Sequence, residues 1–217
     1  MRWIDRIRRA PHPPLQFLIA PSQARLLETV YSGEKPEALG EAGPPTVISF
    51  GTRDGRYDAC ARRLERACRA AGMQASIETI PACPPENAFL FKPTFIKVKL
   101  LTVGGPVLWL DADALVTQPI ALPEGDWDVG TLPNNLGDPV NPKAALCIAF
   151  NPTVAALRFL EHWEQLCAAH WLKPGHDHRR FNYAREILAG HYEEGDLSDA
   201  VRGRLVRDAG REKEAAF

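Results

Sequence analysis

The amino-acid sequence predicts a single-domain α/β fold in which a mixed, mainly parallel sheet is flanked by helices. The chain has 217 residues, which is enough for one such domain with a sizeable core and too few for two. A strand, a helix and a second strand follow one another between residues 46 and 80, and this order implies parallel pairing through a right-handed crossover. The run Val107–Leu110 has no polar residue and is typical of a strand covered on both faces.

The strand-helix-strand unit has clear boundaries. We predict an apolar strand over 46–50, a polar turn over 51–55, an amphipathic helix over 57–71 that ends before Gly72, and a strand over 76–80. Ligands of such sheets bind beyond the carboxyl ends of the strands. The polar turn is therefore a candidate ligand site.

Three residues of this turn, Thr52, Arg53 and Asp54, lie where a nucleotide could be held. The alternative is that Thr-Arg-Asp-Gly forms an ordinary turn with no ligand.

A loop is predicted over 81–87, followed by a helix over 95–103 that a Gly-Gly pair ends. Lys92 precedes this helix and Lys97 lies on it. Both could reach a diphosphate bound at the sheet edge. The alternative is that both are ordinary exposed lysines of a helix.

The apolar run ends abruptly in two carboxylates, Asp111 and Asp113. Two acids at the end of a buried strand are costly unless a cation neutralises them. Mg²⁺ and Mn²⁺ prefer oxygen ligands and are commonly held by one or two carboxylates together with substrate phosphates. We interpret this strand end as a metal-diphosphate site. The alternative is a helix N-cap followed by a solvated turn residue.

The second half of the sequence continues the alternation of strands and helices. We predict strands over 128–132 and 145–150, helices over 153–170 and 179–188, and a long polar loop over 133–143. A polar loop of this length beside the proposed site is a candidate acceptor loop.

Both ends of the chain are predicted to lie outside the domain proper. Residues 1–45 form an N-terminal extension and loop, residues 46–192 the domain, and residues 193–217 a charged tail. The tail alternates in charge sign and is expected to be a solvated helix or a frayed end. A basic segment at the start offers a weak peripheral contact with an anionic membrane, or else packs on the domain, through Arg2, Arg6, Arg8 and Arg9.

The composition argues against several classes of function. The formal net charge of −1 predicts no nucleic-acid partner. No apolar stretch approaches about 18 residues, so neither a membrane span nor a signal peptide is predicted. The five cysteines are scattered without a C-x-x-C pair. We expect reduced, mostly buried thiols in a cytoplasmic protein, with the inner membrane face as the site of any peripheral contact.

An ordered set of features over residues 46–188 resembles the nucleotide-diphospho-sugar glycosyltransferases of GT-A type, which have a Rossmann-like sheet. The features are Val-Ile-Ser-Phe-Gly-Thr-Arg-Asp at 47–54, Lys92-Pro93, Val-Leu-Trp-Leu-Asp-Ala-Asp-Ala at 107–114, Asp-Val-Gly at 128–130, Phe150-Asn151, Trp163 and Asp177-His178. Their order and spacing, rather than any one of them, carry the resemblance.

The resemblance implies transfer of a sugar from a UDP- or GDP-sugar donor to an acceptor hydroxyl on a carbohydrate, a lipid-linked molecule or a protein. Asp113 is similar to the D-x-D carboxylate that binds Mn²⁺ or Mg²⁺, and Asp111 to the one that contacts the metal or the ribose. The metal would offset charge on the departing nucleoside diphosphate. Arg53 and Asp54 would contact the nucleotide base or ribose.

For the acceptor side, Asp177 sits where inverting relatives keep a carboxylate base. His178 or His191 would complete the metal shell. The alternative for the Asp-His pair is a helix start, with Asp177 near the positive end of the helix dipole.

Two departures from the family pattern stand beside the resemblance: the segment after the site is short, and residues before 46 have no obvious counterpart. A sugar-nucleotide-binding domain without catalysis is therefore an alternative. A second alternative is a haloacid-dehalogenase-like phosphatase, whose nucleophile and general acid also form a D-x-D pair after a strand. That motif normally opens the chain, whereas here a strand-helix-strand unit precedes it.

Overall fold

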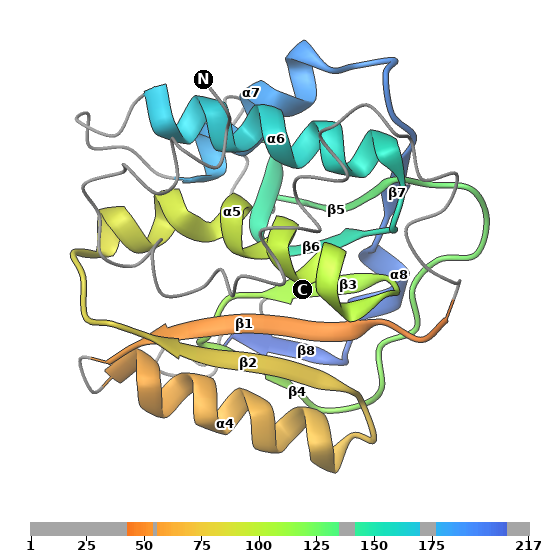
Figure 1. The fold of residues 1–217 in the computed structure, drawn as a ribbon. Helices are drawn as coiled ribbons and strands as arrows, with labels where there is room; N and C mark the ends of the chain where they lie inside the picture. Colours follow the sequence, from red (N-terminus) through yellow and green to blue (C-terminus); the bar gives the residue numbers. More distant parts are fainter. Residues whose placement is uncertain (1–42, 54–55, 135–141, 170–176, 208–217) are drawn as a thin grey trace.

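The computed structural model describes residues 43–53, 56–134, 142–169 and 177–207 (Figure 1). The larger sheet runs in the order β2 (Ala75–Ile80), β1 (Thr46–Thr52), β3 (Val107–Leu110), β6 (Lys143–Phe150), β5 (Val129–Pro133) and β7 (Glu194–Asp196). β1 is parallel to β2 and to β3, and β5 is parallel to β7. β6 is antiparallel to both β3 and β5. The predicted α/β fold with a mixed, mainly parallel sheet is confirmed.

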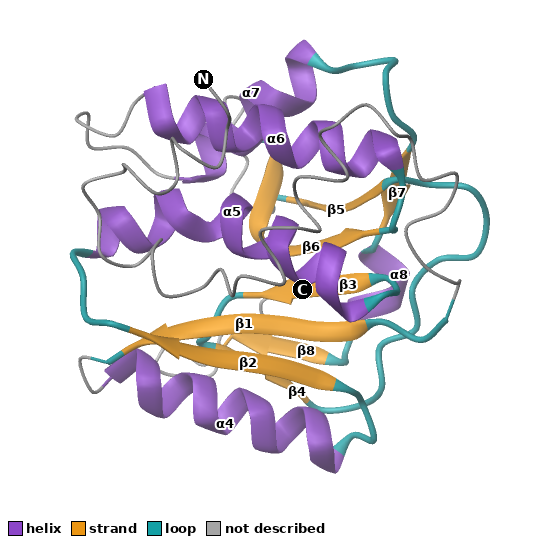
Figure 2. Cartoon of the chain, viewed as in Figure 1, coloured by secondary structure: helices purple, strands orange, loops and turns teal. Residues whose placement is uncertain are grey.

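Helices and a small second sheet cover the two faces of this sheet (Figure 2). One face packs against α5 (Pro85–Val103), α6 (Val154–Ala169) and α7 (Asp177–Ile187). The other packs against α4 (Arg56–Ala70), α8 (Ser198–Val201) and the pair β4 (Ala114–Val116) and β8 (Leu205–Arg207).

The central strand β3 contributes to both cores because successive side chains of a strand point to opposite faces. Val107 and Trp109 lie in the core under α5 and α6, while Leu108 and Leu110 lie in the core under α4. All four residues are buried. The prediction of a strand covered on both faces, with these bounds, is confirmed.

The first strand-helix-strand unit forms as the sequence predicts, with bounds shifted by no more than two residues. β1 pairs with β2 in parallel. α4 can approach β1 closely because Gly51 has no side chain: a Cβ there would lie 2.4 Å from the carbonyl oxygen of Tyr57. Gly72, the predicted residue after α4, has a φ of 70°, a left-handed conformation that glycine adopts without strain.

Helix α5 differs from the prediction at its start. It begins at Pro85 rather than at Phe95, so part of the predicted loop over 81–87 is helical. Pro85 opens the helix, where its missing N–H costs nothing. Pro93 lies inside the helix, a position that normally breaks one. Burial of the surrounding turn, including Phe91 and Phe95, outweighs that local cost.

The other strands and helices that were predicted for the domain agree with the structure to within two residues, and β4 was not predicted. β5 was expected over 128–132, β6 over 145–150, α6 over 153–170 and α7 over 179–188. The sequence pattern did not indicate that β6 would run antiparallel to β3. This orientation brings the start of β6 to the carboxyl end of β3.

The segment after Glu193 corrects a prediction. A solvated helix or frayed end was expected, but β7 adds to the edge of the large sheet and β8 pairs with β4. The apolar residues between and within these strands are buried: Leu197, Val201 and Leu205 all belong to the core under α4. Residues 194–207 are therefore part of the fold.

Some predictions fall on residues outside the described ranges. These include the basic segment at the start of the chain, Asp54, and most of the predicted acceptor loop. Among the described residues, no helix is long and apolar enough to cross a membrane.

Candidate functional site

The candidate site forms where the end of β3 meets the start of β6. Leu110 lies opposite Cys147 in the antiparallel pairing. The backbone N–H of Asp111 donates to the carbonyl of Leu146 at 2.9 Å, which extends the pairing one residue beyond β3. The backbone of Asp111 is therefore held by the sheet itself.

Helix α7 begins against the same end of β6. The N–H of Ala145 donates to Nδ1 of His178 at 3.4 Å. Asn182, one turn further along, accepts from the N–H of Lys143 at 3.2 Å and donates to its carbonyl at 2.9 Å. These contacts place the first turn of α7, with Asp177, beside the sheet edge that carries Asp111.

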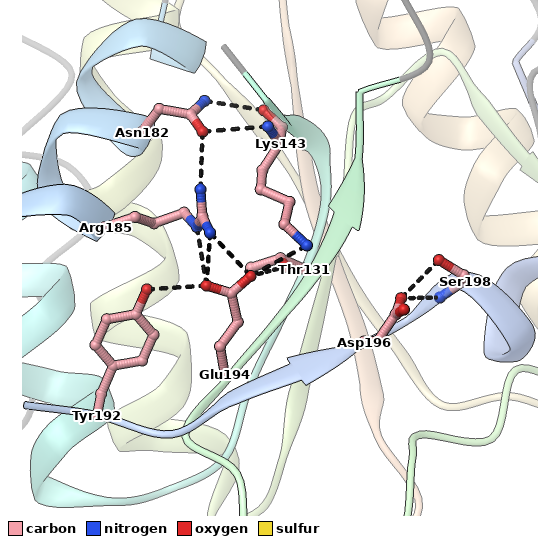
Figure 3. A network of polar contacts seen from close by, with 8 residues as sticks. All are labelled: Thr131, Lys143, Asn182, Arg185, Tyr192, Glu194, Asp196 and Ser198. Atoms are coloured by element: carbon pink, nitrogen blue, oxygen red, sulfur yellow. Dashed lines mark hydrogen bonds and ion pairs between the residues drawn. The ribbon is translucent and has the colours of Figure 1, made fainter. Parts of the chain in front are cut away.

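A network of polar contacts secures this placement (Figure 3). Its centre is Glu194 on β7, which accepts two hydrogen bonds from Arg185 Nη2 at 3.0 and 2.7 Å. Thr131 donates to Glu194 at 2.6 Å, Tyr192 donates at 3.2 Å, and the Lys143 ammonium lies 3.2 Å away. Strands β5, β6 and β7 and helix α7 are thereby tied to one carboxylate.

The most connected side chain of the site is Lys92, from the middle of α5. Its ammonium donates to Oδ1 of Asp111 at 2.9 Å and to the carbonyl of Ala145 at 3.1 Å, and it forms an ion pair with Asp177. It also lies 5.2 Å from the centre of the Trp109 ring, a cation–π distance. The Lys92 side chain is only 4% exposed.

The electrostatics follow from these contacts. Burial alone would raise the pKa of the Asp111 carboxyl, but the Lys92 ammonium and the hydrogen bonds from Lys92 and Trp109 hold that pKa below its usual value. Burial alone would lower the pKa of Lys92, but Asp111 and Asp177 raise it. Asp111 and Lys92 are therefore both charged at neutral pH, and the buried ammonium needs its carboxylate partners because an unpaired buried charge costs several kcal/mol.

A cavity of about 130 Å³ opens beside this charge cluster. Its walls come from the carboxyl ends of β1 and β3, the start of α4 and the first half of α5. They combine aromatic and apolar side chains with a lysine and two aspartates: Phe50, Thr52, Tyr57, Cys83, Pro85, Ala88, Phe89, Lys92, Trp109, Asp111, Ala112 and Asp113. A concave, mainly apolar site with few polar groups is typical of a small-molecule pocket.

The two predicted metal ligands Asp111 and Asp113 line this cavity together. Both hydrogen bonds that Asp111 accepts from described side chains end on Oδ1. Two carboxylates with room for a phosphate fit the oxygen chemistry of Mg²⁺ or Mn²⁺. Within the described residues, however, no group of three or more His, Cys, Asp or Glu could hold a metal. His178, whose Nδ1 accepts from Ala145, is thus not brought into one ligand group with the two aspartates.

Of the other predicted site residues, some line the cavity and others lie away from it. Thr52 is buried and lines the cavity. Arg53 is exposed, and its N–H donates to the carbonyl of Ile80 at 3.0 Å. Asp177 is buried behind Lys92 and does not belong to the described cavity wall. His191 is exposed, and its N–H donates to Leu188 at the end of α7.

Lys97 lies away from the cavity. Its side chain is fully buried between α5 and α6 and forms an ion pair with Glu164, which also accepts from Thr94 at 2.6 Å. The structure therefore does not bring Lys97 to the site. The alternative of ordinary exposed lysines is wrong for both Lys92 and Lys97, because each has a carboxylate partner that offsets the cost of burial.

Comparison with solved structures finds glycosyltransferases. One is a glycosyltransferase involved in the glycosylation of the major capsid of PBCV-1, with a TM-score of 0.54 and 15% identity, covering 78% of this chain and 95% of that one. Another is GlyE of Streptococcus pneumoniae TIGR4, with a TM-score of 0.49 and 13% identity, covering 72% of this chain and 45% of that one. No family model and no curated protein matches the chain. The first likeness shows that this chain has a glycosyltransferase fold.

Proposed function

We propose that this protein is a glycosyltransferase that moves a sugar from a nucleoside-diphosphate-sugar to an acceptor hydroxyl. The observation that carries the proposal is that Asp111 and Asp113 both line one cavity, at the end of a buried strand. Ligands of open α/β sheets bind at such strand ends. The fold shared with a glycosyltransferase supports the same conclusion.

Asp111 and Asp113 would hold Mn²⁺ or Mg²⁺ together with the two phosphates of a UDP- or GDP-sugar. The metal would supply Lewis-acid stabilisation of charge on the nucleoside diphosphate. Thr52 and Tyr57 line the same cavity, and they would contact the nucleoside. The adjacent Arg53 would reach the nucleotide from the rim.

The predicted role of Asp177 as a general base depends on whether an acceptor can reach it. A general base must lie within hydrogen-bond reach of the hydroxyl that it deprotonates. Asp177 is 3% exposed and is already paired with Lys92. Its role as base stays a prediction that requires the acceptor to reach it. Its contacts favour a positioning role, in which it shares the Lys92 ammonium with Asp111.

The test is calorimetric titration of UDP and of GDP into the protein, with Mn²⁺ and with a chelator. We expect binding of one nucleotide that depends on the metal, followed by slow hydrolysis of the matching sugar donor. The Asp113→Ala variant should lose this binding and all turnover and keep the fold. Asp126→Ala is the matched control because Asp126 is exposed and lies off the cavity wall.

The outcomes separate the candidate functions. Metal-dependent nucleotide binding without donor turnover would favour a non-catalytic binding domain. Full activity of the Asp113→Ala variant would show that the proposed metal site is wrong. Absence of nucleotide binding under every condition, with hydrolysis of a phosphate ester instead, would favour the phosphatase alternative.

A further inference from the structure

We infer that Lys92 is an internal cation that holds Asp111 in the metal-free protein and competes with the divalent metal for that carboxylate. The inference rests on the proposed function, since it takes Asp111 and Asp113 as the metal ligands. It assigns a role to a residue whose sequence context indicated only a reach toward phosphate.

The Lys92 ammonium is held by three partners. Lys92 donates hydrogen bonds to Asp111 Oδ1 and to the carbonyl of Ala145, and it forms an ion pair with Asp177. The side chain is 4% exposed, so water does not compete for these positions. The ammonium is therefore held in one place by three different segments of the fold.

Asp111 belongs both to this ion-pair cluster and to the cavity wall. It accepts from Lys92 at 2.9 Å, and it lines the cavity together with Asp113. A metal ion bound by the two aspartates would therefore share the Asp111 carboxylate with the Lys92 ammonium.

Lys92 competes with a metal ion for the Asp111 carboxylate. Lys92 lies 2.9 Å from Oδ1 of Asp111, so its positive charge opposes a second cation on the same carboxylate. A unit charge within a few ångströms in a partly buried site changes the affinity for another ion by about tenfold or more. Asp177 moderates this effect because it shares the ammonium.

Two variants therefore have opposite expected effects on the binding of Mn²⁺ alone, measured by calorimetry without nucleotide. Lys92→Met removes the competitor, and Mn²⁺ should bind about tenfold more tightly. Asp177→Asn leaves the ammonium to Asp111, and Mn²⁺ should bind about tenfold more weakly. Lys99→Met is the matched control: it removes a lysine charge from the same helix, where Lys99 pairs with Glu78, and should leave the affinity unchanged.

Thermal unfolding gives a second readout. Lys92→Met should unfold at a lower temperature than the wild type without metal, because two carboxylates lose their buried partner. Mn²⁺ should then raise its unfolding temperature more than it raises that of the wild type. If Lys92→Met does not fold even with Mn²⁺, the Mn²⁺ affinity of the Asp177→Asn variant tests the inference.

Two results would overturn the inference, provided that the wild type binds Mn²⁺. One is an affinity for Mn²⁺ that is unchanged or lower in Lys92→Met. The other is an affinity that is unchanged in Asp177→Asn. Lys92 would then be a structural ion pair only. Failure of the proposed metal site is distinguishable from this, because in that case neither the wild type nor any variant binds Mn²⁺.

Discussion

Two lysines five positions apart on α5 are both buried and both paired with carboxylates, yet their surroundings differ. Lys92 faces the end of β3, where its partners Asp111 and Asp177 come from separate segments and a cavity adjoins. Lys97 faces α6, where its partner Glu164 lies between packed helices. A buried ion pair alone therefore does not mark a functional site in this protein. The neighbouring cavity is what distinguishes the two.

The largest expected contrast is in activity. Asp111→Asn should lower sugar transfer at least about 100-fold, the scale of losing one electrostatic contact to a developing charge. Glu164→Gln should change it by less than about twofold, because distant sites act independently. Initial rates with the donor identified by titration would measure both. A large loss in Glu164→Gln would mean that the interface between α5 and α6 affects the cavity, so that the two lysine sites would not be independent.

The next contrast is in stability. Glu164→Ala leaves the Lys97 ammonium buried without its carboxylate, which should cost about 3–5 kcal/mol in the free energy of unfolding. A double variant, Lys97→Met with Glu164→Leu, should restore stability to within about 1 kcal/mol of the wild type, because apolar packing replaces a buried pair without penalty. Denaturant unfolding measures all three proteins. A double variant as unstable as Glu164→Ala would show that the pair itself specifies the packing.

The same two lysines show what local sequence can and cannot predict. The bounds of β3 and the position of Asp111 and Asp113 follow from an apolar run and an abrupt change to acids, which are local signals. The burial of Lys92 depends on Asp177, which is 85 positions away (177 minus 92). No local pattern carries that contact. The helix was predicted to begin only at Phe95, whereas α5 already includes Lys92 and Pro93, although a proline normally interrupts a helix.

The C-terminal strands escaped prediction for a related reason. β7 consists of Glu194, Gly195 and Asp196, which show no apolar alternation. The strand forms because its backbone pairs with β5 and because Glu194 gathers Arg185, Thr131 and Lys143. Both causes are contacts between distant segments. A sequence whose charges alternate in sign is expected to be solvated. Its contacts with other strands and side chains can be identified only from the three-dimensional structure.

The smallest predicted effect concerns the network that holds α7 beside Lys92. Burial would raise the pKa of Glu194, but hydrogen bonds from Thr131 and Arg185 hold it below the ordinary value of 4.5. A carboxyl with a lowered folded-state pKa stabilises the protein above its unfolded-state pKa, and this contribution is lost as pH falls through the folded-state value. The wild type should therefore lose about 1 kcal/mol below pH 4.5 that a Glu194→Gln variant does not lose.

Urea unfolding at a series of pH values between neutral and strongly acidic would measure this difference. Glu186→Gln is the matched control, because Glu186 is exposed on the same helix and its replacement should leave the pH dependence unchanged. Parallel curves for the wild type and the Glu194→Gln variant would contradict the prediction. The network would then hold α7 without depending on the charge of Glu194, and the position of Asp177 behind Lys92 would rest on Asn182 and its two bonds to the backbone of Lys143.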